Sequence, residues 1–68
     1  MPSMKVKIYC VRELKGGGSI RISKYYPTWL GCKRKRNSIH REFPFFRHIV
    51  HEEIVDEETA KQMLNDTI

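Results

Sequence analysis

Residues 4–26 have the sequence MKVKIYCVRELKGGGSIRISKYY, and this stretch determines the expected fold. Apolar and polar residues alternate over residues 4–10 and again over residues 19–26, which is the period-2 pattern of half-buried strands. The glycines between them, Gly16–Gly18, can take the positive φ that a tight turn requires. The sequence therefore predicts an N-terminal hairpin over residues 4–26.

The middle of the chain is expected to add further strands. Pro27 cannot donate to a ladder, so it ends the second strand or confines it to an edge. Trp29-Leu30-Gly31 is interpreted as a bend that returns the indole to the core. Residues 32–43 are interpreted as a second hairpin, about Asn37-Ser38. Residues 45–50 fit a helix or a strand, and their β-branched and aromatic content favours a strand.

The C-terminal segment 56–66 has the signals of a helix. Asp56 is a good N-cap, and Glu57 and Glu58 complement the helix dipole in the first turn. Three residues form the expected apolar stripe: Ala60, Met63 and Leu64. We therefore predict one α+β domain over residues 1–68, with a small antiparallel sheet of three to four strands and one C-terminal helix packed on one face. A domain this small has a limited core, so a homodimer is expected.

Charge is unevenly distributed along the chain. The formal net charge is +5. Residues 1–51 contain twelve lysines and arginines but only two acids, whereas residues 52–68 contain one lysine and six acids. A cationic body with an acidic end suits a polyanion or an acidic protein surface.

The densest positive charge is the run Lys33-Arg34-Lys35-Arg36. In a strand these cations would occupy both faces, and no packed core accepts unpaired charge, so the run is expected to be exposed. It is a candidate phosphate-contacting arm, and the alternative is a solvated edge that deters aggregation. Four further cations are candidates for the same anion-binding surface: Arg21, Lys24, Arg41 and Arg47.

Aromatic residues flank this run on both sides. Tyr25 and Tyr26 are adjacent in a predicted strand, so their rings point to opposite faces and one of them is the best candidate for stacking on bases. The other aromatic residues are interpreted mainly as packing residues of the core. They are Trp29, Phe43, Phe45 and Phe46.

Metal binding and catalysis have little support in the sequence. The potential metal ligands lack the close CxxC spacing on which small zinc folds rely. They are Cys10, Cys32, His40, His48 and His51. The neighbouring cations are expected to lower the pKa of Cys32, and His40 could act as its base, but a domain of this size does not readily enclose a water-excluding pocket. We expect no catalytic residue, no metal and no cofactor.

The leading hypothesis is a small non-enzymatic protein that binds DNA or RNA, chiefly through phosphates, and a regulatory role would fit it. The alternative is an adaptor or inhibitor that docks its cationic face or an edge strand on an acidic protein. The signatures of RRM, KH and zinc-finger modules are missing. The chain shows neither a signal peptide nor a membrane-spanning stretch, so a cytoplasmic location with reduced thiols is expected. In a eukaryote the basic run could also serve as a nuclear address.

Overall fold

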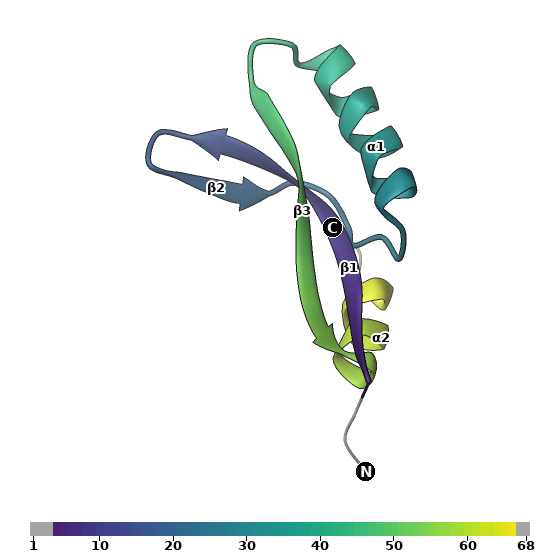
Figure 1. Cartoon of the computed structure of the whole chain (residues 1–68). Helices are drawn as coiled ribbons and strands as arrows, with labels where there is room; N and C mark the ends of the chain where they lie inside the picture. The colour runs from purple at the N-terminus through teal and green to yellow at the C-terminus, as the bar shows by residue number, and fades with distance from the viewer. Residues whose placement is uncertain (1–3, 67–68) are drawn as a thin grey trace.

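The computed structural model describes residues 4–66 and contains three strands and two helices (Figure 1). The predicted α+β class, with a small antiparallel sheet and a C-terminal helix, is confirmed. The elements in chain order are β1 (Lys5–Lys15), β2 (Gly18–Arg21), α1 (Trp29–Glu42), β3 (Arg47–Asp56) and α2 (Glu57–Asn65). None of the described helices is long and apolar enough to cross a membrane.

The sheet has the order β2-β1-β3, and both pairings are antiparallel. A hairpin is present where it was predicted, because β1 and β2 pair next to a turn in which Gly17 has a φ of 88°. Its second strand is shorter than predicted: β2 ends at Arg21, and beyond it Tyr26 forms only an isolated bridge with Tyr9. β3 pairs with β1 over the whole length of β3, from Lys5 opposite Asp56 to Leu14 opposite Arg47. The strand favoured for residues 45–50 is also confirmed, since β3 covers most of that stretch.

The two helices lie on opposite faces of the β1–β3 ribbon. α1 contacts the face that carries His48, because Arg36 bonds to the His48 carbonyl and His40 contacts the His48 ring. At the other end, α2 contacts β1 and β3. There the paired Val6 and Val55 are half-buried, whereas residues of the opposite face are exposed, so α2 covers the side of the ribbon away from α1. Figure 1 shows α1 beside the upper part of the sheet and α2 beside the lower part.

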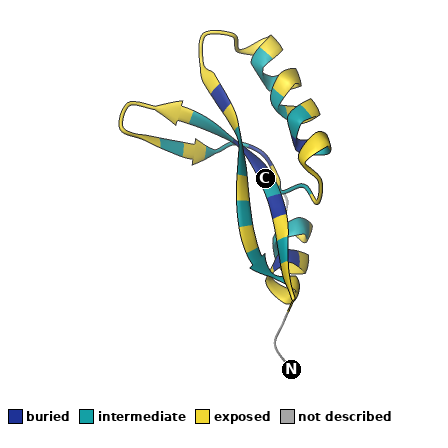
Figure 2. Cartoon of the chain, in the orientation of Figure 1, coloured by how far each residue is buried: buried dark blue, intermediate teal, exposed yellow. Residues whose placement is uncertain are grey.

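The core is small and lies where the elements meet (Figure 2). The buried apolar residues among those described are Ile8, Cys10, Val11, Cys32 and Ala60. In α2, Ala60 is buried and Met63 and Leu64 are half-buried, as the predicted stripe requires. Asp56 occupies the N-cap position, but its side chain makes no capping hydrogen bond and instead pairs with Lys5 at 2.7 Å.

The interpretation of residues 32–43 as a basic hairpin is wrong. The run Lys33–Arg36 lies in the middle of the 14-residue helix α1, and the sheet has three strands. Lysine and arginine have high helix propensity, and no β-branched residue interrupts the chain between Trp29 and Ser38. The run is exposed largely because one side of a helix faces solvent, rather than because of a protruding strand.

The expected bend at residues 29–31 is also wrong, because these residues form the first turn of α1. Trp29 is 51% exposed and does not return to the core. Thr28 is the N-cap, and its hydroxyl accepts a hydrogen bond from the Gly31 N–H at 3.2 Å. A Cβ on Gly31 would lie 3.1 Å from that hydroxyl oxygen, so glycine suits this close approach.

Candidate nucleic-acid interface

Two polar contacts, from Arg36 and His40, join the inner side of α1 to β3. Nε of Arg36 donates to the carbonyl oxygen of His48 at 3.0 Å, and Nη1 donates to Oδ1 of Asn37 at 3.1 Å. The Nδ1 atoms of His40 and His48 lie 3.2 Å apart, with the rings edge to face. Arg36, predicted to contact phosphate, is therefore half-buried and bonded within the protein.

The outer side of α1 carries the cations that remain available. Arg34, Lys35 and Arg41 are exposed, and Lys33 is half-buried with its Nζ 5.9 Å from the centre of the Trp29 ring. We call these four residues the α1 basic face. Among the described residues, none of the four forms an ion pair, whereas three lysines of β1 are paired with carboxylates. The basic face is therefore a concentration of uncompensated positive charge on one helix.

Arg21 and Lys24 belong to a separate region beside β2. Nη1 of Arg21 donates to the carbonyl of Ser23 at 3.1 Å, and its guanidinium lies 4.6 Å from the Tyr25 ring centre. Nζ of Lys24 lies 5.4 Å from the Tyr26 ring centre. These two cations thus contact their own segment rather than extending the α1 basic face.

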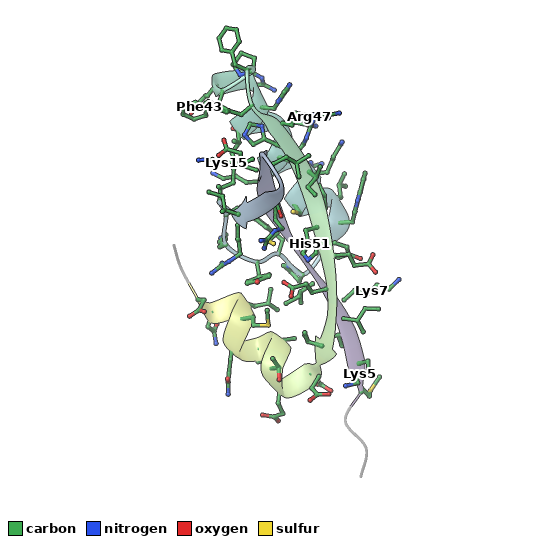
Figure 3. The ribbon with its side chains drawn as sticks, turned by 90° about the vertical axis from the view of Figure 1, so that its left-hand side faces the viewer. Lys5, Lys7, Lys15, Phe43, Arg47 and His51 are labelled. Carbon is green, nitrogen blue, oxygen red and sulfur yellow. The ribbon has the colours of Figure 1, made fainter. Side chains whose placement is uncertain are left out.

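Arg47 is exposed at the start of β3. It pairs in register with Leu14, on the face of the ribbon opposite His48 and therefore opposite α1. Figure 3 shows Arg47 and Phe43 pointing to opposite sides of the molecule. Of the eight predicted anion-binding residues, the α1 basic face contains only Lys33, Arg34, Lys35 and Arg41. Arg34 and Arg41 are seven residues apart and follow one line, and Lys33 and Lys35 lie on its two flanks.

The exposure of the aromatic residues is the reverse of what the sequence suggested. Tyr25 and Tyr26 are both half-buried, and burial raises the pKa of each hydroxyl, with the nearby Glu53 raising that of Tyr25 further. Trp29, interpreted as a core residue, is exposed, as are the three phenylalanines that follow α1. The aromatic surface is therefore at the ends of α1 and not on the strand after β2.

An apolar pocket of about 330 Å³ lies beside the C-terminal end of α1. Phe43 and Phe46 line it together with residues of the sheet, while Phe45 in the intervening loop is 94% exposed. The complete lining consists of Glu13, Ile22, Ile39, Phe43, Phe46 and His48. The pattern of hydrophobic residues in the sequence did not indicate that the loop between α1 and β3 would be exposed to solvent.

The expectation of a reactive Cys32 is wrong. Its side chain is fully buried, and burial, with a smaller contribution from Cys10, raises its pKa to about 11. Burial also raises the pKa of Cys10. Both thiols are free and protonated near neutral pH, so they are structural residues. Within residues 4–66, no three histidine, cysteine or acidic residues are grouped to hold a metal ion.

Comparison with models of known protein families, with curated proteins and with solved structures finds no match.

Proposed function

We propose that this protein binds nucleic acid through the α1 basic face, chiefly by phosphate contacts. The observation that supports this is the set of four cations on α1 without a carboxylate partner in the described chain: Arg34 and Arg41 follow one line along the helix, and Lys33 and Lys35 lie on its two flanks. The face runs from Lys33 to Arg41, about 12 Å along the helix axis, so it is long enough to lie beside more than one phosphate of a backbone rather than one small anion.

The helix dipole does not account for three of these charges. The first turn of α1 contains no acidic residue, and Lys33, Arg34 and Lys35 lie in its middle, where the helix dipole gives cations no benefit. Glu42 is the single acid within α1. A bound polyanion would supply the missing countercharge, since neutralising phosphates releases their condensed counterions.

We further propose that the protein acts in the cytoplasm and has no catalytic role. Both thiols are buried and protonated, so neither is available as a nucleophile. The half-buried Tyr25 and Tyr26 are no longer the preferred stacking residues. Trp29 is better placed, because it is exposed at the start of the same helix and adjoins Lys33.

A mobility-shift titration tests this function with single-stranded DNA, duplex DNA and RNA at about 50 and about 200 mM salt. With four phosphate contacts on duplex DNA, affinity should fall about 100-fold between these conditions. Substituting alanine for Arg34, Lys35 and Arg41 together should remove most of that dependence. The matched control substitutes alanine for Lys5, Lys7 and Lys15, which removes the same charge but should leave binding in place. No retardation of any nucleic acid at low salt would overturn the proposal.

A second candidate is a protein partner, favoured by the exposed Phe45 beside an apolar pocket and by the edge strand β3. β3 has no second neighbour among the described strands, so it could add to a partner sheet. An acidic partner could also contact the α1 basic face, and a second copy could use the same loop to form a homodimer. Phe45→Ser should abolish binding that uses this loop, whereas it should leave nucleic-acid retardation unchanged.

A further inference from the structure

The outer side of α1 carries more than positive charge. Arg34, Asn37, Ser38 and Arg41 lie at positions i, i+3, i+4 and i+7, so they follow one side of the helix, and all four are exposed. Arginine and asparagine are the side chains that most often form paired hydrogen bonds with the edges of guanine and adenine. Asn37 contributes no charge, so phosphate attraction does not explain its place between the cations.

Arg36 holds the amide of Asn37 in a defined orientation. One guanidinium donates through Nε to the carbonyl of His48 in β3 and through Nη1 to Oδ1 of Asn37. A guanidinium has donors only, so the amide oxygen must be the atom facing Arg36, and the NH₂ group is turned away from it. The oxygen keeps a second lone pair. The amide can therefore still accept one hydrogen bond and donate another.

We propose that α1 enters the major groove of duplex DNA and that Asn37 contacts a base edge there, with Arg36 as its positioning residue. This inference rests on the proposed function and specifies its ligand. The groove of B-form DNA is about 12 Å wide and accepts an α-helix of about 10–12 Å diameter. The major groove of A-form RNA is deep and narrow, so duplex RNA should not accept α1 in this way.

The arrangement of the molecule permits such an approach. α1 lies at one side of the sheet, and its outer side is exposed along its length (Figure 2). The acidic helix α2 covers the other face of the ribbon, at the opposite end of β1. In this geometry the amide of Asn37 pairs with an adenine, donating to N7 and accepting from the N6 amino group. Arg34 and Arg41 would lie one turn to either side of it.

Selection from a random duplex DNA library tests the inference. The wild-type protein should enrich a short common sequence, and Asn37→Ala should reduce discrimination at one base pair about 5- to 140-fold. Asn65→Ala makes the same change at an exposed position of α2. This variant is the matched control and should enrich the same sequence as the wild-type protein. Duplex RNA of the enriched sequence should bind more weakly than the DNA.

The outcomes separate this inference from the proposed function. Retardation of DNA without any enriched sequence, or equal binding of duplex RNA, would overturn groove entry and leave phosphate binding intact. No retardation would overturn both. Arg36→Lys keeps the charge but loses the paired geometry, so it should reduce discrimination while the salt dependence of affinity stays unchanged. Circular dichroism confirms that each variant is folded, and full discrimination in folded Arg36→Lys would exclude its positioning role.

Discussion

The two helices of this protein lie on the same two-stranded ribbon but have opposite charge, and the charges have different explanations. In α2, Glu57 and Glu58 occupy the first turn, where the partial positive charge of the helix N-terminus stabilises them. In α1 the cations lie mainly in the middle, where the dipole gives no such benefit. The acids of α2 are thus explained by local stability, whereas the helix dipole does not explain the cations in the middle of α1, and for these we propose a ligand outside the chain.

The helices also differ in how they are attached. α2 presents an apolar stripe to the sheet, with Ala60 buried. α1 has one fully buried residue, Cys32, and is also joined to β3 by one hydrogen bond from Arg36 and by the His40–His48 contact. Directional contacts fix the rotation of a helix about its axis, so they hold the α1 basic face outward.

The largest expected effect comes from reversing the charge of α1. Substituting glutamate for Arg34, Lys35 and Arg41 changes the net charge by six units and replaces attraction to phosphate by repulsion. We expect nucleic-acid binding to be abolished at about 50 mM salt in a mobility-shift assay. Reversing Lys5, Lys7 and Lys15 instead makes the same change in net charge but should leave measurable binding. Equal loss in both variants would show diffuse attraction rather than an interface on α1.

The second-largest expected effect concerns the two sides of the β1–β3 ribbon near α2, which covers one side and leaves the other exposed. Ile8 is 1% exposed in the core, whereas Ile54 is 61% exposed on the side that α2 leaves uncovered. Ile8→Ala should lower the free energy of unfolding by about 2–5 kcal/mol, enough to unfold much of a domain whose core supplies about 3–5 kcal/mol. Ile54→Ala should change it by less than about 0.5 kcal/mol in urea titrations. A large loss in Ile54→Ala would mean that a second copy covers that side.

A third effect concerns Cys32, the buried residue of α1. The folded pKa of about 11 exceeds the ordinary value of 9.0, so the folded state holds its proton more tightly than the unfolded state. Its contribution to stability is complete below pH 9 and should be lost as the pH rises through 9 to about 11. Urea unfolding at several pH values measures this decline, which should be smaller in Cys32→Ala. The same decline in both proteins would assign it to other groups.

The difference between the helices also explains what could be read from the sequence. The hairpin and α2 were predictable because period-2 alternation, glycines and first-turn acids are local signals. α1 was missed because its inner side combines Cys32 and Ile39 with Arg36 and His40, so apolar periodicity is weak. The available signals were the N-cap Thr28 and the run of helix-forming lysines and arginines.

The exposed aromatic residues could not be predicted from local patterns. Composition alone suggests that Trp29 and the phenylalanines fill the core, because they are the largest apolar side chains. Their exposure depends on the path of α1, which begins at Trp29 and ends just before the loop that holds Phe45. Burial is a property of the tertiary arrangement, so the correct helix had to be known first.

The smallest effect distinguishes the two explanations of charge most directly. Substituting glutamine for Glu57 and Glu58 removes the favourable interaction with the α2 dipole and should lower stability by about 0.3–1 kcal/mol per residue at low salt. That corresponds to about 4–8 °C in melting temperature per kcal/mol for a domain of this size.

Substituting glutamine for Arg34 and Lys35 should not lower the melting temperature, because these cations stabilise no described contact. Raising the salt to about 1 M shortens the screening length to about 3 Å and should remove the loss in the α2 variant. If the α1 variant instead melts lower than the α2 variant in the absence of nucleic acid, the cations of α1 stabilise the fold and need no external ligand to explain them.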